Sequence, residues 1–155
     1  LARYYRPYRM RMEEQVRACL AAGERVVHLS SHTFTPVLNG VVRNADVGLP
    51  SDPPRRRERA FCERWGELLA QRIAPLRVRR NYPYRGYDDG LTTGLRRLYP
   101  AERYIGIEIE VNQRHALGPR PAWRRLREAI VETALEMVAQ TRDGGRDPWG
   151  GSVHN

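Results

Sequence analysis

The chain has 155 residues, of which 41% are hydrophobic, so it has the size of one domain and can bury a core. Its formal charge of +9 would ordinarily suggest a nucleic-acid partner, but the basic residues are all arginines scattered along the chain, which indicates codon bias rather than a binding patch. No apolar run could cross a membrane and no signal peptide opens the chain, so we expect a cytoplasmic protein without nucleic-acid or membrane partners; the sequence indicates no oligomeric state.

The first predicted helix covers residues 8–22, with Pro7 in its first turn and Gly23 at its C-terminal cap. Residues 25–34, RVVHLSSHTF, follow as a buried strand, because β-branched and apolar residues alternate there between Gly23 and Pro36. The two cysteines, Cys19 and Cys62, fall among apolar positions of predicted helices, so we expect them to be reduced core residues.

The predicted strand carries two histidines, His28 and His32, on the same face as Ser30. On a helix their spacing would suit one metal ion, but on a strand the rings start about 13 Å apart, so at most one binds a given metal. Ligands of open α/β sheets sit beyond the carboxyl ends of the strands, which favours His32. The alternative is a core histidine that donates to a backbone carbonyl, and it applies more strongly to His28.

A long polar connection, residues 33–52, comes next and is expected to be a functional loop. Asp52 and Pro53 then predict the start of a helix that runs to Pro75, with an apolar stripe formed by Phe61, Trp65, Leu68, Leu69 and Ile73. Residues 76–80 form a short predicted strand, and the segment NYPYRGYDDGLTTG after it is a second candidate site loop.

Three more elements complete the prediction: a short helix carrying Leu91, Leu95 and Leu98, a strand over residues 104–112, and a helix over residues 121–141. This order predicts an α/β three-layer sandwich with a mostly parallel or mixed sheet. Three strands make an unusually small sheet, so we expect a partner or missing sequence to complete it. Residues 1–143 are assigned to one partial domain and residues 144–155, with His154, to a disordered tail.

The chemistry is expected where the predicted strands end. Glu108 and Glu110 share one face of the strand over residues 104–112, and a buried carboxylate needs either an arginine partner or a function. Glu110, nearer the carboxyl end, would face the same crevice as His32 and could activate a metal-bound water. The loops around the crevice supply three candidate substrate-binding residues, Arg43, Asn81 and Arg85, and a solvated arginine is the alternative for Arg43.

Five segments occur in the same order as similar segments of the N-formylglutamate amidohydrolase family: HLSSHTFTP, VVRNADVGLPSDP, RERAFCERW, NYPYRGYDDG and YIGIEIEVNQ. The resemblance implies a fold like that of the zinc carboxypeptidases and a metal-dependent hydrolase that cleaves an amide of a small acidic substrate. It implies that His32 is a zinc ligand and Glu110 the general base, whereas Glu108 occupies a position where related sequences can carry glutamine.

The family's other two metal ligands, a histidine and a glutamate in an N-terminal segment, have no counterpart in residues 1–24. Because catalytic zinc usually takes three protein ligands, we expect the chain to be the C-terminal part of a longer protein, without its N-terminal strands, or a decayed member of the family. The leading hypothesis is a zinc-dependent amidohydrolase that converts N-formyl-L-glutamate, or a similar N-acyl amino acid, to formate and L-glutamate. The alternatives are a noncatalytic small-ligand-binding domain of the same fold and a basic nucleic-acid-binding module.

Overall fold

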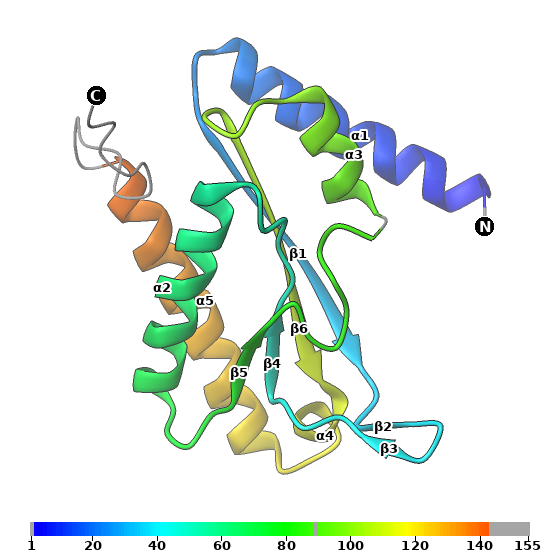
Figure 1. Ribbon diagram of the computed structural model, residues 1–155, viewed down its shortest axis with the longest axis vertical. Helices are drawn as coiled ribbons and strands as arrows, with labels where there is room; N and C mark the ends of the chain where they lie inside the picture. The colour runs from blue at the N-terminus through cyan, green and yellow to red at the C-terminus, as the bar shows by residue number, and fades with distance from the viewer. Residues whose placement is uncertain (1, 89, 143–155) are drawn as a thin grey trace.

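Two long parallel strands form the centre of the computed structural model, which describes residues 2–88 and 90–142 (Figure 1). Strands β1 (Val26–Phe34) and β6 (Tyr104–Asn112) pair in parallel over their whole length. The register places His28 opposite Gly106 and His32 opposite Glu110. Since paired residues of neighbouring strands point to the same face of a sheet, the register brings the polar faces of β1 and β6 together.

Two shorter strands extend the sheet beyond β6, in the order β1-β6-β4-β5. Strand β4 (Val47–Leu49) runs antiparallel to β6, and β5 (Val78–Arg80) runs parallel to β4. The sheet is therefore mixed, as the sequence analysis allowed, but it has four strands, so the prediction of three is wrong. The missed strand β4 lies in the connection over residues 33–52, where its three residues are too few to show a periodic pattern.

The same connection also forms a small hairpin from β2 (Val37–Leu38) and β3 (Val41–Val42). Asn39 and Gly40 make its turn with φ of 51° and 76°, the left-handed conformation that Asn-Gly hairpin turns require. Strand pairing thus orders part of this connection.

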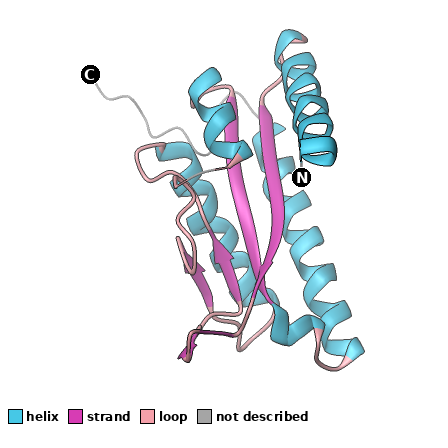
Figure 2. Ribbon diagram, turned by 90° about the vertical axis from the view of Figure 1, so that its right-hand side faces the viewer, coloured by secondary structure: helices cyan, strands magenta, loops and turns pink. Residues whose placement is uncertain are grey.

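Helices cover both faces of the sheet (Figures 1 and 2). On one face α2 (Arg56–Arg72) and α5 (Arg120–Arg142) pack against Ile105, Ile107, Ile109 and Val111, the apolar face of β6. On the other face Val16 of α1 (Ala2–Ala21) and Leu95 of α3 (Leu91–Leu98) pack against Tyr104. A four-residue helix, α4 (Gln113–Ala116), joins β6 to α5. The layers agree with the predicted sandwich.

Several predicted boundaries are corrected. Helix α1 begins before Pro7, which lies inside it, and α2 begins at Arg56 rather than at Asp52 and Pro53. The strand predicted over residues 76–80 is confined to β5, whereas β6 has the bounds that its alternation predicts. Cys62 is buried and Cys19 half-buried, both as free thiols. The predicted tail, with His154, lies outside the described residues.

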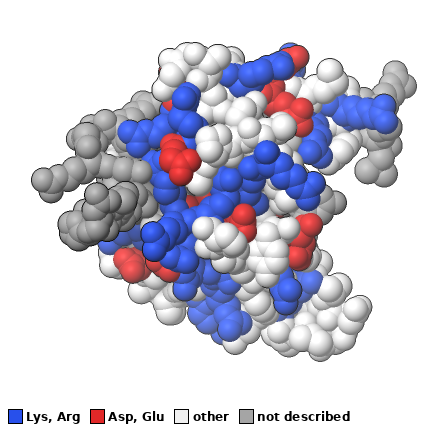
Figure 3. Space-filling view, turned by 45° about the horizontal axis from the view of Figure 1, so that its top comes forward, with Lys and Arg blue, Asp and Glu red and all other residues white. Residues whose placement is uncertain are grey.

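The surface charge is mixed, and a membrane span would need a helix that is both long and apolar. Figure 3 shows arginine side chains distributed over much of one face, with acidic side chains among them. None of the helices within residues 2–88 and 90–142 is long and apolar enough to cross a bilayer.

A buried ionic cluster joins the two helical layers at the edge of β6 that faces away from β1. The Glu58 side chain of α2 is fully buried and accepts bonds from Arg96 Nε of α3, at 3.1 Å to Oε1 and 3.0 Å to Oε2. Arg55 Nε lies 3.0 Å from Oε1, and the backbone N–H of Gly106 donates to the same oxygen at 3.1 Å. Arg96 also donates to the carbonyls of Gly86 and Gly106, so one guanidinium ties α2, α3, β6 and the second site loop.

Removing one member of this cluster should cost far more stability than removing a surface charge. Arg96→Met leaves the Glu58 carboxylate buried with less compensation, so we expect the free energy of unfolding in urea to fall by about 3–5 kcal/mol. The matched control is Arg64→Met, which breaks the exposed Arg64–Glu67 pair and should change stability by less than about 1 kcal/mol. Equal small losses in both variants would contradict this assignment.

Candidate functional site

The polar faces of β1 and β6 line a cavity of about 570 Å³ beneath α1. The strands contribute side chains of alternate residues, because residues two apart share a face. The second site loop and α1 form the remaining walls. The ionisable lining residues are His28, His32, Arg85, Asp88, Glu108 and Glu110, together with the tyrosines Tyr5, Tyr8 and Tyr84.

His32 and Glu110, the two residues expected to act together, both line this cavity from paired positions of neighbouring strands. The His32 side chain is exposed, and its Nε2 lies 2.9 Å from the hydroxyl of Ser30, two residues earlier on the same face. The sequence prediction that these side chains share one crevice agrees with their placement. Their chemical roles stay predictions.

Glu110 is the least satisfied polar group of the cavity. It is 5% exposed, and its Oε2 is buried without a hydrogen-bond partner among the described residues. Burial raises the pKa of Glu110 from its ordinary value of 4.5 to about 7; the nearby charge of Glu108 adds to the rise and that of Arg43 opposes it. Near neutral pH this carboxyl group therefore populates both its protonated and its ionised form, as a proton-transfer group must.

Glu108 sits two residues before Glu110 on the same face and is only half-buried. Its Oε1 accepts a hydrogen bond from the hydroxyl of Thr92 at 2.8 Å. The expected arginine partner is thus replaced, within the part of the chain that the structure describes, by a threonine of α3. Fixing Glu108 in this way holds one negative charge close to Glu110.

The other two described histidines have partners of their own. His28 is buried, and its Nδ1 lies 2.8 Å from the hydroxyl of Tyr104, a side-chain partner in place of the expected backbone carbonyl. Burial, together with the charge of Arg96, lowers the pKa of His28, which favours a neutral ring. His115 Nε2 lies 2.7 Å from Asp46 Oδ1 and is not part of the cavity lining.

The three predicted substrate-binding residues lie in three different environments. Arg43 is buried and donates to the Tyr84 hydroxyl at 3.1 Å, with its guanidinium carbon 5.1 Å from the Tyr84 ring centroid. Arg85 is exposed on the cavity wall. Asn81 does not line the cavity: its Oδ1 accepts from the backbone N–H groups of Ser51 and Gly86, at 3.0 and 3.1 Å. Asn81 therefore shapes the loop that carries Arg85.

Sequence reasoning missed the contribution of α1. Tyr5, Tyr8 and Met12 line the cavity from this helix. Tyr8 and Met12 fall inside the predicted helix but carried no signal of a cavity, and Tyr5 precedes it, where no apolar period predicts a helix. Thr92 was missed for a different reason, because a threonine in a short helix carries no signal of a carboxylate partner. The one signal in the sequence for the tyrosines that line the cavity from α1 is the high density of tyrosine near the start of the chain.

The described residues do not by themselves fit a catalytic zinc ion. Such a site usually takes three protein ligands, leaving a position for water. Within residues 2–88 and 90–142 no three His, Cys, Asp or Glu side chains lie together as a metal-binding group. His32 supplies one exposed imidazole, and its Nε2 forms a hydrogen bond with the Ser30 hydroxyl.

Comparisons with known proteins show which family and which solved structure this chain resembles. The family model described as N-formylglutamate amidohydrolase matches residues 1–117. Gene product Atu2144 from Agrobacterium tumefaciens, a crystal structure, is similar with a TM-score of 0.63 and 27% sequence identity, over 88% of this chain and 51% of that chain. The present chain thus spans about half the length of that protein. No match is found among curated proteins.

The raised pKa of Glu110 predicts a stability that falls as pH rises. Below pH 4.5 the group is protonated in both the folded and unfolded chain; between pH 4.5 and about 7 only the folded chain keeps the proton. The contribution of Glu110 to the free energy of unfolding should therefore decrease in this window by up to about 1.4 kcal/mol per pH unit. Glu110→Gln mimics the protonated form and removes this slope.

Urea unfolding between pH 4 and 8 measures how the free energy of unfolding changes with pH in the wild-type protein and in Glu110→Gln. Glu108→Gln serves as a second variant, because deleting its charge should lower the Glu110 pKa and end the decline at a lower pH. Parallel pH profiles of the wild-type protein and Glu110→Gln would show that Glu110 titrates normally.

Proposed function

Because the chain belongs to the N-formylglutamate amidohydrolase family, we propose that its cavity is part of the active site of a hydrolase acting on linear amides, with Glu110 as the proton carrier. The proposed substrate is N-formyl-L-glutamate or a similar small N-acyl amino acid, and the products are formate and L-glutamate. The proposal extends to the fold, for which we infer a relationship to the zinc carboxypeptidases.

The observation that carries this proposal is the state of Glu110. A buried carboxyl oxygen without a partner costs folding free energy, so a group of this kind is expected where function requires it. Its pKa of about 7 lies near the usual working pH, which is optimal for a group that must both accept and donate a proton. Glu110 also faces an open cavity instead of the closed core.

Amide hydrolysis needs two proton movements, and Glu110 is proposed to make both. It accepts a proton from the water that adds to the formyl carbonyl carbon. It then gives this proton to the amine nitrogen as the carbon–nitrogen bond breaks, so the carboxylate is regenerated. Glu108, held by Thr92, raises the Glu110 pKa and so strengthens it as a base.

Binding of an acidic substrate is proposed to involve Arg85 and Arg43. Arg85 is exposed at the wall, where it can pair with a substrate carboxylate by a two-pronged hydrogen bond. Arg43 lies behind Tyr84, so it acts through that ring or after the ring moves aside. Asn81 contributes by holding the loop of Arg85, through its bond to Gly86 N–H.

Zinc stays a prediction for this protein, with His32 as the proposed ligand from this chain. No step above depends on the metal, because the described residues do not complete a site for it. That same observation favours the second candidate function, a noncatalytic small-ligand-binding domain. The two candidates differ in turnover: the binding domain would take up N-formyl-L-glutamate without releasing formate.

The mechanism is tested by Glu110→Gln, which keeps the shape of the side chain but removes the basic site. We expect kcat for formate release to fall by roughly 10² to 10⁴-fold, the usual contribution of a positioned acid or base. Activity is measured on the longest natural form that contains this chain. Glu108→Gln is the matched control on the same strand face and should lose much less. A fully active Glu110→Gln enzyme would remove this residue from the mechanism.

Metal binding is predicted to be weak in the 155-residue chain, since one ligand cannot replace three. Dialysis against zinc followed by metal analysis should give well under one ion per chain, and the chain alone should not hydrolyse N-formyl-L-glutamate. In a longer natural form, His32→Ala should lower the zinc content whereas His28→Ala should leave it unchanged. Stoichiometric zinc in the short chain, or loss of zinc only in His28→Ala, would contradict the assignment.

A further inference from the structure

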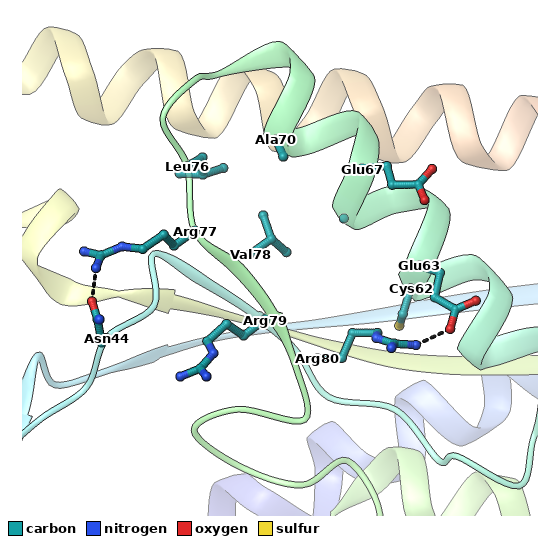
Figure 4. Close-up of a pocket in the computed structure, with 11 residues that line it drawn as sticks. Asn44, Cys62, Glu63, Glu67, Ala70, Leu76, Arg77, Val78, Arg79 and Arg80 are labelled. Atoms are coloured by element: carbon teal, nitrogen blue, oxygen red, sulfur yellow. Dashed lines mark hydrogen bonds and ion pairs between the residues drawn. The ribbon is translucent and has the colours of Figure 1, made fainter.

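A groove of about 680 Å³ lies at the opposite edge of the sheet from β1, between α2 and β5 (Figure 4). One wall is residues 76–80, which include β5; the other is a stripe on α2. Residues three and four apart lie on one face of a helix, and here they are Cys62, Glu63, Gly66, Glu67 and Ala70. The middle of this wall has small side chains, so α2 leaves space alongside the strand.

The backbone of β5 has one used and one unused edge. The Arg77 carbonyl accepts from the backbone N–H groups of Asp46 and Val47, and the Asn81 N–H donates to the Leu49 carbonyl. Backbone groups of successive strand residues point to opposite edges, so those of Val78 and Arg80 point away from β4. Strand β5 is the last of the described sheet, and these outward groups can pair with an added strand.

The two faces of β5 differ in chemistry. Val78 and Arg80 point toward α2, where Val78 is half-buried near Gly66 and Arg80 pairs with Glu63 (Figure 4). Arg77 and Arg79 alternate with them and lie on the other face. Arg77 donates to Asn44, whereas Arg79 stacks on the Tyr82 ring, with its guanidinium carbon 4.6 Å from the ring centroid. A stacked arginine can still bind a carboxylate through its in-plane N–H groups.

We propose that this groove binds an extended segment of a partner protein, which adds to β5 as a fifth strand and alternates apolar with acidic side chains. An added strand places alternate side chains on opposite faces of the sheet. On the α2 side the side chains of the added strand would meet the apolar surface of Gly66, Ala70 and Val78, which an apolar residue fits. The nearby carboxylates of Glu63 and Glu67 would repel an acidic side chain there. On the other side the added side chains lie beside Arg77 and Arg79, which attract carboxylates.

A labelled octapeptide that alternates valine and glutamate is the probe, and fluorescence anisotropy with the 155-residue protein is the measurement. We expect saturable one-to-one binding that weakens at least tenfold when the peptide N–H groups facing β5 are methylated, since strand pairing then fails. Equal binding of the methylated peptide would overturn the proposal.

Three variants test the two walls. Arg79→Glu should weaken binding of the valine–glutamate peptide at least tenfold and strengthen binding of a valine–arginine peptide. The control Arg97→Glu makes an equal charge change at an exposed position of α3 and should leave binding within about twofold of the wild-type value. Ala70→Tyr should block the apolar wall and weaken both peptides, with circular dichroism confirming the fold. Equal losses in Arg79→Glu and Arg97→Glu would show nonspecific attraction to a basic protein and overturn the proposal. So would sedimentation showing that a second copy of the chain fills the groove.

Discussion

The buried contact between Glu58 and Arg96 is the constraint on which the arrangement of the molecule depends. An unpaired charge in the interior is strongly destabilising, so Glu58 and Arg96 must be buried together. Glu58 belongs to the α2 layer and Arg96 to the α3 layer, and they meet at Gly106 of the strand between them. The backbone N–H and carbonyl of Gly106 bond to Glu58 and Arg96 respectively. The cluster thus sets how the two helical layers are placed relative to the sheet, and through Gly86 it also holds the second site loop in place.

The cavity follows from that placement and from the register of β1 with β6. The register decides that His32 and Glu110 are neighbours, while α1 and α3 decide how far the cavity is closed from water. The high pKa of Glu110 is the electrostatic result of this closure, because burial is its largest cause. Stability and chemistry are therefore coupled: an ionised Glu110 opposes folding, and the rest of the core must compensate.

How much of this could be predicted depended on the length of each pattern. Strand β6 alternates over nine residues, and its bounds were predicted correctly. Strand β4 has three residues with Gly48 in the middle, so its strand character comes entirely from its neighbours. The predicted start of α2 at Asp52 and Pro53 was wrong because it followed local propensity alone. In the structure the Asp52 N–H donates to Glu58 Oε2. That Glu110 and His32 line one cavity was predicted from their strand positions, whereas the loop contact of Asn81 is with Ser51, 30 residues away in the sequence.

Gly48 shows how closely the second site loop lies on the sheet. A side-chain carbon added at this position would overlap the carbonyl oxygen of Tyr82 and lie 3.3 Å from the Cβ of Glu110, its pairing partner on β6. The space that every other amino acid would need is filled by the backbone of the loop. Position 48 is therefore closed to variation: in a library of random substitutions it would accept glycine alone, although nothing in its local sequence distinguishes it from a tolerant loop residue.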